Sequence, residues 1–400
     1  MKHPLLSYEA ALTRLLDAAR VQGKTEMVGL LQAQGRILAA PLLSDCAVPP
    51  HDNSAMDGYA LRCADVAAAG TRLQVAQRIA AGATGSALQA GTAARIFTGA
   101  PIPPGADAVV MQERCRADGD GVWVDELPRL GQNIRRAGED ILQGAVVIEA
   151  GRQLGAAHIG LAASVGATQL LVHRPLRVAV FFTGDELREP GEALPAGAIY
   201  NSNRYVLRAL LDQLGCQVTD LGIVRDDAAK TREALRSAAA GHDVVITCGG
   251  VSVGEEDHVK AAVEAEGALS LWKIAIKPGK PLAFGRVGEA DFIGLPGNPV
   301  SAYVTFLTLV QPFLRKRQGR RGANMPPRRV KAGFEWPRAD DRREFLRAQI
   351  DEAGRAVLFP KQGSGVLTSC AWAHGLVVLA PSQTVAIGDE VQFLSVQELT

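Results

Sequence analysis

The stretch DVVITCGGVSVGEED, residues 243–257, is the part of this chain that says most about its fold. Its first six residues form a mainly apolar, β-branched run, which predicts a buried strand. Two glycines follow at once, and three carboxylates come soon after, at Glu255, Glu256 and Asp257. Glycines let backbone N–H groups approach an anion, and neighbouring carboxylates can hold a divalent cation. The stretch therefore predicts a phosphate-and-metal site, with a glycine-rich turn beside solvated acids as the alternative.

Strands and helices alternate on both sides of this stretch. The predicted strands include VAVFF, VTDLGIV, LWKIAI and DFIGL, and the predicted helices are YVLRALLDQLG, DDAAKTREALRSAAAG and NPVSAYVTFLTLVQPFL. Strands separated by helices of this length predict a parallel sheet with right-handed crossovers. We therefore expect a doubly wound, mostly parallel sheet domain over residues 176–326, with ligands beyond the carboxyl ends of its strands.

Polar clusters follow five of the predicted strands, at residues 183–186, 226–227, 249–257, 277–280 and 296–298. Because carboxyl ends of parallel strands meet at one edge, these clusters are expected to converge. The acids of TGDEL could bind a metal or ribose hydroxyls, or cap the next helix. Asp226 and Asp227 stand at a predicted helix start, where the helix dipole favours acids in any case.

The segment IKPGKP places Lys277 and Lys280 on either side of Pro-Gly. Two ammonium groups held close together repel each other and favour a polyanion between them, which predicts an oxyanion site. A surface loop with two lysines is the alternative. In LPGNPVS, Asn298 and Ser301 stand at a predicted helix N-terminus, which favours an anion pocket.

The rest of the chain predicts three further domains, so the expected fold class is multidomain α/β. Residues 1–45 and 147–175 predict an elongated, mainly helical domain, and residues 46–146 a β-rich insertion. Residues 327–400 predict a small C-terminal β-barrel. The basic stretch at 315–331 is interpreted as a solvated linker, with phosphate or nucleic-acid attraction as the alternative.

Composition limits the function classes. The 400 residues carry a net charge of +1, so no global field recruits nucleic acid or an anionic membrane. Six scattered cysteines without a C-x-x-C pair favour free thiols in a reducing compartment. No signal peptide or transmembrane helix is expected, which predicts a cytoplasmic protein. The chain also lacks a G-x-S-x-G elbow, an H-E-x-x-H motif, a Walker A loop and a Rossmann fingerprint.

Taken together, the motifs resemble those of the MoeA / gephyrin E-domain family, the molybdopterin molybdenumtransferases. The resemblance runs from about Ser7 to about Ser369 and rests on eight segments in the family's order. They are DNSAMDGYA, FTGAPIPPGADAVVMQE, GQNIRRAGEDI, FTGDEL, LGIVRDD, CGGVSVGEED, WKIAIKPGKP and GLPGNPVSAYVTF.

This resemblance implies an enzyme that binds adenylylated molybdopterin with Mg²⁺, inserts molybdate and releases AMP. It also implies an elongated four-domain homodimer with a composite site. The implied protein partners are an adenylyltransferase and downstream cofactor-insertion proteins. Binding to nucleic acid or to a membrane is not expected. An adenylyltransferase that makes this substrate is one alternative, against which the insertion and the C-terminal β domain argue. A non-catalytic scaffold is another, against which the intact acids and lysines argue.

The resemblance assigns roles to individual positions. The nucleotide and Mg²⁺ acids would be Glu186, Asp226 and Asp257, and the phosphate cradle Gly249, Gly250 and Ser252. The anion-holding set would be Lys273, Lys277, Lys280 and Ser301, and the insertion would add Asp57, Thr98 and Asp140. The C-terminal domain would add Arg347 and Ser369 as molybdate contacts. The catalytic set would be Asp57, Asp140, Glu186, Asp226, Asp257, Lys273 and Lys277. The remaining substrate-binding positions would be Thr183, Gly184, Asp185, Pro281, Pro296, Gly297, Asn298 and Pro299.

Overall fold

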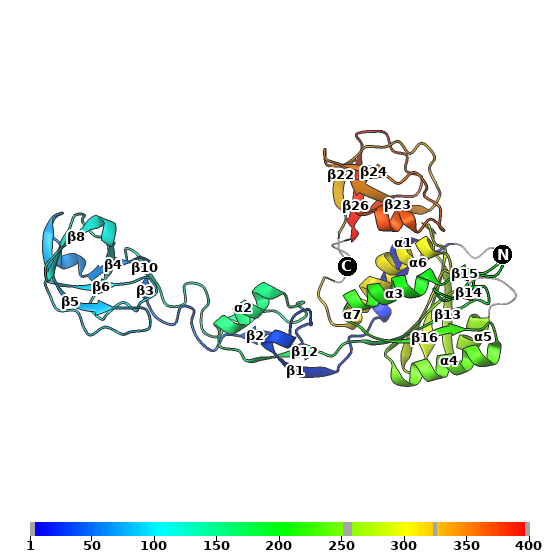
Figure 1. Cartoon of the computed structure of the whole chain (residues 1–400), viewed down its shortest axis with the longest axis horizontal. Helices are drawn as coiled ribbons and strands as arrows, with labels where there is room; N and C mark the ends of the chain where they lie inside the picture. The colour runs from blue at the N-terminus through cyan, green and yellow to red at the C-terminus, as the bar shows by residue number, and fades with distance from the viewer. Residues whose placement is uncertain (1–4, 251–257, 323–325, 397–400) are drawn as a thin grey trace.

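The computed structural model describes residues 5–250, 258–322 and 326–396. Figure 1 shows an elongated molecule, with an α/β domain and a β-barrel together at one end and a second β domain at the other. A thin arm joins the two ends. The chain runs out along this arm and back again, so the distal β domain is an insertion.

The α/β domain is built on a six-stranded sheet in the order β16-β13-β17-β21-β20-β18. The first four strands are parallel to one another, whereas β20 and β18 are antiparallel to their neighbours. The strands are β13 (Arg177–Thr183), β16 (Gln217–Val224), β17 (Val244–Cys248), β18 (Gly267–Lys273), β20 (Pro281–Val287) and β21 (Ala290–Leu295). The mostly parallel sheet is confirmed. The antiparallel edge was not predicted, and it follows from the two-residue link between β20 and β21, which can only reverse the chain.

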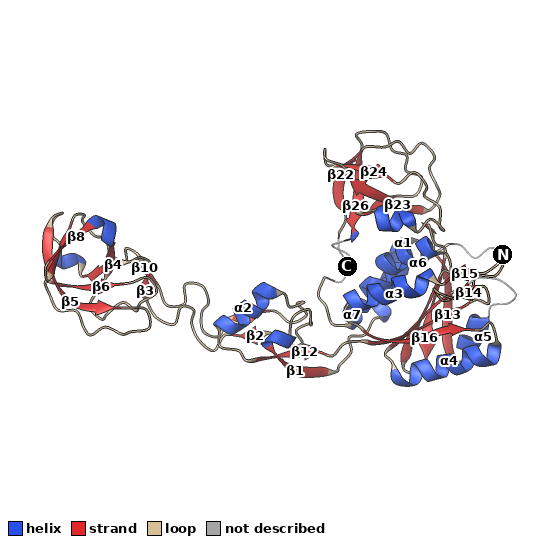
Figure 2. Ribbon diagram, in the orientation of Figure 1, coloured by secondary structure: helices blue, strands red, loops and turns tan. Residues whose placement is uncertain are grey.

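Helices cover both faces of this sheet, as Figure 2 shows. One face carries α1 (Tyr8–Ala18), α3 (Ser202–Gln213), α6 (Pro299–Thr305), the π-helical η4 (Phe306–Val310) and α7 (Gln311–Arg317). The other carries α4 (Ala228–Gly241) and α5 (His258–Glu266). Successive side chains of a strand point to opposite faces, so Phe182 packs in the first core and Phe181 in the second. This arrangement confirms the doubly wound fold.

The N-terminal region is less helical than predicted. The helix α1 ends at Ala18, and its apolar face, with Leu12 and Leu15, packs in the core of the α/β domain and not in the arm. The predicted division placed residues 1–45 with the arm. Glycines break the helical pattern beyond Ala18, because glycine disfavours a helix interior.

The arm itself consists of paired strands, one helix and a short turn of helix. They are β1 (Thr25–Gly29), η1 (Leu30–Gln32), β2 (Leu42–Leu43), β11 (Val146–Ile148), α2 (Ala156–Ser164) and β12 (Gln169–His173). β1 pairs with β12, and β2 with β11, both antiparallel. Nearer the distal domain, Val48 forms an antiparallel bridge with Ile141. The segments that enter and leave the distal domain therefore run side by side.

The distal domain holds a six-stranded sheet in the order β7-β4-β6-β5-β9-β8 and a short pair, β3 with β10. Buried Leu61, Val110 and Ile96 belong to two core clusters confined to this domain. Its elements are β3 (Asn53–Ser54), β4 (Gly58–Leu61), η2 (Cys63–Asp65), β5 (Thr71–Ile79), β6 (Thr92–Ile96), β7 (Ala108–Met111), η3 (Gln112–Arg114), β8 (Cys115–Asp118), β9 (Gly121–Val124) and β10 (Ile134–Arg135). The residue limits of the four predicted domains stay predictions.

The C-terminal domain is a five-stranded barrel, which confirms the predicted fold. The order β23-β24-β22-β26-β25 closes because β25 also pairs with β23. Its elements are β22 (Arg328–Ala332), β23 (Arg343–Ile350), β24 (Arg355–Leu358), α8 (Thr368–Trp372), β25 (Gly375–Leu379) and β26 (Glu390–Ser395). The short strand β19 (Ile276–Lys277) of the α/β domain joins this sheet by pairing in parallel with β23. The pair β14 (Leu187–Arg188) and β15 (Ile199–Tyr200) completes the fold.

The first part of the basic stretch is not a solvated linker, contrary to the prediction. Arg315 is 1% exposed. Arg317 pairs with Asp291 at 2.9 Å, and Lys316 Nζ donates to the carbonyl of Leu16 at 2.7 Å. These cations therefore fasten the end of α7 to its own domain. In the described part of the chain, no helix has both the length and the apolar character to cross a membrane.

Candidate functional site

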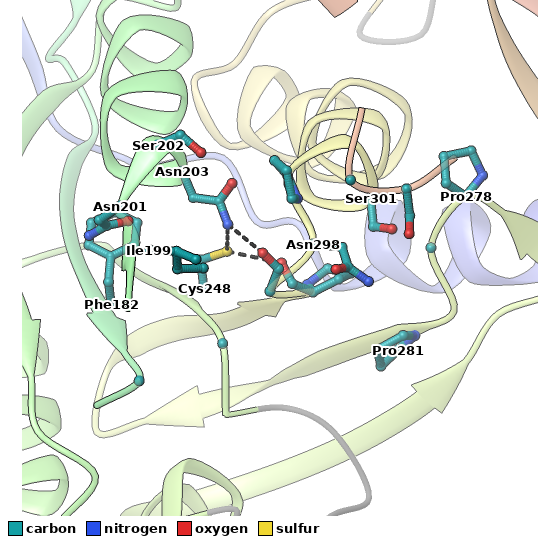
Figure 3. A pocket seen from close by; sticks show the side chains of 18 of the residues that line it. Phe182, Ile199, Asn201, Ser202, Asn203, Cys248, Pro278, Pro281, Asn298 and Ser301 are labelled. Atoms are coloured by element: carbon teal, nitrogen blue, oxygen red, sulfur yellow. Dashed lines mark hydrogen bonds between the residues drawn. The ribbon is translucent and has the colours of Figure 1, made fainter. Parts of the chain in front are cut away.

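A cavity of about 1010 Å³ lies at the carboxyl ends of the parallel strands. Its wall comes from the ends of β13, β17 and β21, the loop after β19, the start of α3, and a loop of the C-terminal barrel (Figure 3). The strand ends thus converge on one edge, as the parallel topology requires.

Most of the predicted sheet-domain residues line this cavity. They are Thr183, Gly184, Glu186, Asp226, Gly249, Gly250, Lys277, Lys280, Pro281, Pro296, Gly297, Asn298, Pro299 and Ser301. Asp185 and Lys273 do not line it, although Asp185 Oδ1 accepts a hydrogen bond from the backbone N–H of Asp226 at 3.4 Å. Ser252 and Asp257 lie outside the described residues.

The Gly-Gly turn after β17 requires glycine at both positions. Gly249 and Gly250 have φ values of +95° and +62°. A Cβ on Gly249 would lie 2.6 Å from the carbonyl oxygen of Thr183. The Thr183 residue is 5% exposed, and among the described residues its hydroxyl has no hydrogen-bond partner. A bare backbone beside an unpaired buried hydroxyl fits a ligand that brings its own hydrogen-bonding groups.

The residues Asn203 and Cys248 join three parts of the cavity wall, and neither was predicted. Asn203 Nδ2 donates to Cys248 Sγ at 3.0 Å and to the Gly297 carbonyl at 2.7 Å. Cys248 Sγ in turn donates to the Pro296 carbonyl at 2.9 Å (Figure 3). Burial raises the pKa of the Cys248 thiol to about 12, so it stays a protonated donor. We call these two side chains the amide–thiol clamp. Only the segment NSN at a predicted helix start could have pointed to it.

The two lysines of the IKPGKP segment reach the cavity from the end of β19 and from the loop after it. Lys280 is exposed, whereas Lys277 Nζ lies 3.0 Å from Asp340 Oδ2 and 2.9 Å from Glu344 Oε1. Burial lowers the pKa of Lys277, but the hydrogen bonds to Glu344 and Asp340 outweigh it and raise the pKa overall. Lys277 is therefore a fixed ammonium group, and Lys280 is the freer cation of the pair.

Two carboxylates at the cavity could hold a metal ion. Glu186 and Asp226 both line it and are exposed to solvent. Among the residues that the structure describes, no group of three or more His, Cys, Asp or Glu side chains is arranged to hold a metal. Mg²⁺ usually binds through one or two carboxylates together with substrate phosphates. The donor chemistry of Glu186 and Asp226 therefore fits Mg²⁺ arriving with a phosphate ligand.

The predicted C-terminal contacts Arg347 and Ser369 do not line the cavity. Both are 0% exposed, and Arg347 Nε donates to Ser369 Oγ at 3.0 Å. Arg347 Nη2 also donates to the Gly363 carbonyl at 3.3 Å, so it supports the loop at residues 363–365 from behind. The side chains that this domain presents to the cavity are instead Arg342, Gln362 and Ser364. In the sequence, only the glycine-rich segment KQGSG at residues 361–365, which contains Gln362 and Ser364, could have indicated these cavity contacts.

The insertion residues Asp57, Thr98 and Asp140 lie in or next to the distal domain, and none of them lines the cavity. Asp57 Oδ1 accepts hydrogen bonds from the backbone N–H of Thr98 at 2.8 Å and from its hydroxyl at 2.7 Å. The backbone hydrogen bond, with help from the hydroxyl, lowers the pKa of Asp57. Asp57 is thus a fixed carboxylate between β3 and β4 of the distal domain, which Figure 1 shows at the far end of the arm.

A cavity at the edge of an α/β sheet, walled partly by a C-terminal barrel and combined with a distal insertion, defines a multidomain α/β protein with a polar ligand site between two of its domains. The chain belongs to the MoeA family. Family models match the MoeA N-terminal region (domains I and II) at residues 6–166, a probable molybdopterin-binding domain at 179–316, and the MoeA C-terminal region (domain IV) at 329–396.

Similar proteins cover nearly the whole chain. A molybdopterin molybdenumtransferase of Haemophilus influenzae is 41% identical over 97% of this chain and 98% of its own. One of Nostoc sp. is 38% identical over 93% of this chain and 89% of its own. The crystal structure of the molybdopterin biosynthesis MoeA protein of Pyrococcus horikoshii superposes with a TM-score of 0.86 at 29% identity, covering 98% of this chain and 99% of that one.

Proposed function

We propose that this chain is a molybdopterin molybdenumtransferase, which inserts molybdenum from molybdate into adenylylated molybdopterin and releases AMP. The observation that supports it most is the cavity of about 1010 Å³, where a bare Gly-Gly turn faces two lysines and two carboxylates. Its size suits a pterin nucleotide, since ligand cavities commonly range up to about 1,000 Å³.

The phosphate end of the substrate would lie at the Gly-Gly turn. Gly249 and Gly250 offer backbone that can approach an anion closely, with Thr183 beside them as a buried hydroxyl. Glu186 and Asp226 would hold Mg²⁺, with Asp257 as a further candidate metal ligand and Ser252 as a further candidate of the phosphate cradle, both outside the described residues. When bound, Mg²⁺ would neutralise phosphate charge. The carboxylates would keep that ion at the strand ends, and the amide–thiol clamp joins the end of β17 to the Pro296–Gly297 backbone.

The oxyanion end would lie at Lys277, Lys280 and Ser301. Molybdate is a dianion, so ammonium groups and hydroxyl donors match its charge and its oxygens. Ser301 is 3% exposed at the start of α6 and lines the same cavity. We add Arg342 and Ser364 to this set because they line the cavity. Arg347 and Ser369 act behind them by supporting the loop.

Asp57, Thr98 and Asp140 would contribute to the cavity of a second subunit in a homodimer. None of them lines the cavity of its own chain, and the distal domain stands at the far end of the arm (Figure 1). The protein would act in the cytoplasm, since its six cysteines are free thiols, which a reducing compartment maintains.

The decisive experiment measures AMP release from adenylylated molybdopterin with Mg²⁺, with and without molybdate. Release that molybdate stimulates supports the proposal. Tight nucleotide binding without release at any molybdate concentration would contradict it and indicate a carrier. Omitting Mg²⁺ should abolish release, because the cavity carboxylates then repel the substrate phosphates.

A further inference from the structure

Two carboxylates of the C-terminal barrel hold the cavity lysine Lys277. Its ammonium group lies 3.0 Å from Asp340 Oδ2 and 2.9 Å from Glu344 Oε1. Glu344 is 1% exposed, and its other oxygen accepts a hydrogen bond from Trp336 Nε1 at 2.8 Å. The ammonium group of Lys277 is therefore already paired with two carboxylates before any ligand arrives.

The same cluster contains a second cation. Arg342 Nε and Nη2 each donate to a carboxylate oxygen of Asp340 at 2.9 Å. These hydrogen bonds, together with that of Lys277, hold the pKa of Asp340 well below its usual range. The cluster therefore consists of two cations, Lys277 and Arg342, and two carboxylates, the ionised Asp340 and the buried Glu344. An approaching oxyanion therefore meets two cations that are already paired with carboxylates.

The backbone fixes this contact in place. Lys277 in β19 is the register partner of Glu344 in β23, and Ile276 is the partner of Arg343. Partners in a ladder carry their side chains on the same face, which keeps the ammonium and carboxylate groups adjacent. The contact also joins the barrel to the α/β domain, so a change at Lys277 is felt at the junction of the two domains.

We infer that Asp340 and Glu344 are positioning residues that compete with an incoming oxyanion for the ammonium group of Lys277, an inference that rests on the proposed function. Binding of the oxyanion then requires Lys277 to exchange at least one carboxylate for an oxyanion oxygen. By reciprocity, a ligand that draws Lys277 away weakens the contact between barrel and sheet domain to the same extent. The two carboxylates thus lower the affinity of Lys277 for every oxyanion. Only a dianion, which attracts the ammonium group more strongly than a monoanion does, then binds there tightly.

The test is isothermal titration calorimetry of molybdate alone into the full-length wild type, D340N and E352Q. Asn keeps the shape of Asp340 and removes its charge. We expect D340N to bind molybdate about fivefold more tightly, because one negative charge beside the dianion is gone. E352Q is the matched control, because Glu352 is an exposed carboxylate in the turn between β23 and β24, at the opposite end of β23 from Glu344. Its affinity should equal that of the wild type.

Steady-state assays with saturating substrate supply a second readout. The KM for molybdate should fall in D340N by a similar factor, whereas kcat should change less. E344Q, with its melting temperature recorded, repeats the test at the buried carboxylate. Molybdate binding by D340N that equals or falls below the wild-type affinity would overturn the competition.

The variant K277A separates this inference from the proposed function. If K277A binds molybdate as the wild type does, the oxyanion site itself is wrongly placed. If K277A loses binding while D340N leaves it unchanged, the oxyanion site stands and only the competition fails. Loss of binding in K277A with tighter binding in D340N supports both.

Discussion

The cavity at the sheet edge and the distal β domain both contain predicted site residues, but the two regions hold them differently. Around the cavity, Gly249, Lys277 and Ser301 are brought together from separate strands by the sheet itself. In the distal domain, Asp57 and Thr98 bond to each other and do not line the cavity of their own chain. Folding of a single chain builds the cavity, whereas the distal residues would act on a cavity only in the proposed homodimer, where that cavity belongs to a second subunit.

The largest effect is expected at Lys277. K277A should lower molybdate-dependent AMP release about a hundredfold, because a fixed cation at the oxyanion is lost. Release is measured at saturating nucleotide, with a circular dichroism spectrum to check the fold. K331A, which removes an exposed lysine of the barrel strand β22, is the control and should release AMP at the wild-type rate. An active K277A would remove the oxyanion role from the cavity.

Mixing two inactive variants tests the distal region directly. D57N and K277A should each be inactive alone, yet regain about a quarter of wild-type activity when their subunits are exchanged. Random exchange makes half of the dimers mixed, and each mixed dimer holds one unaltered composite site of two. A mixture that stays inactive after confirmed subunit exchange would show that the distal residues do not complete a partner's cavity.

The amide–thiol clamp should matter less than the cations. N203A loses both hydrogen bonds of Asn203, so the Gly297 backbone shifts and kcat/KM should fall about tenfold. C248S keeps a donor for the Pro296 carbonyl and should stay close to wild type. Equal activity of N203A and the wild type would assign the clamp to folding alone. Melting temperatures of both variants reveal any general loss of stability.

The smallest effect concerns the carboxylate of Asp57. Its folded-state pKa is lowered, so it stabilises the fold above its ordinary pKa, and this stability is lost as pH falls through the folded pKa. In T98A the pKa of Asp57 should rise towards its ordinary value, and the variant should be slightly less stable than wild type at pH 7. The two proteins should become equally stable in strongly acidic solution. NMR titration of the carboxyl carbon and urea unfolding at several pH values measure both effects.

The sequence predicted the cavity well where local pattern decides structure. Apolar runs of strand length that alternate with helices predict a parallel sheet. In such a sheet the strand ends that carry Thr183, Gly249 and Pro296 lie at one edge. The antiparallel strand β20 was missed because its pattern, PLAFGRV, follows a loop and carries no distinctive signal. The clamp was missed for a similar reason, since an asparagine inside a helix and a cysteine ending a strand match no motif.

Long-range docking could not be predicted. Asp340 and Glu344 meet Lys277 only because the barrel packs against the sheet domain, and no spacing in the sequence encodes that contact. The resemblance pointed to Ser369, which does not line the cavity, and gave no indication of Ser364, which does. Both lie near the barrel's loop, and only the packing of Arg347 shows that Ser369 lies behind it.

The antiparallel bridge between Val48 and Ile141 has an evolutionary consequence. The chain enters and leaves the distal domain at neighbouring points. The whole domain is therefore a separable insertion, and its removal or exchange would leave the sheet and its cavity intact. A longer paired arm would change the distance between the inserted domain and the sheet without altering any residue of that domain. Relatives could therefore diversify in reach and in chemistry independently of each other.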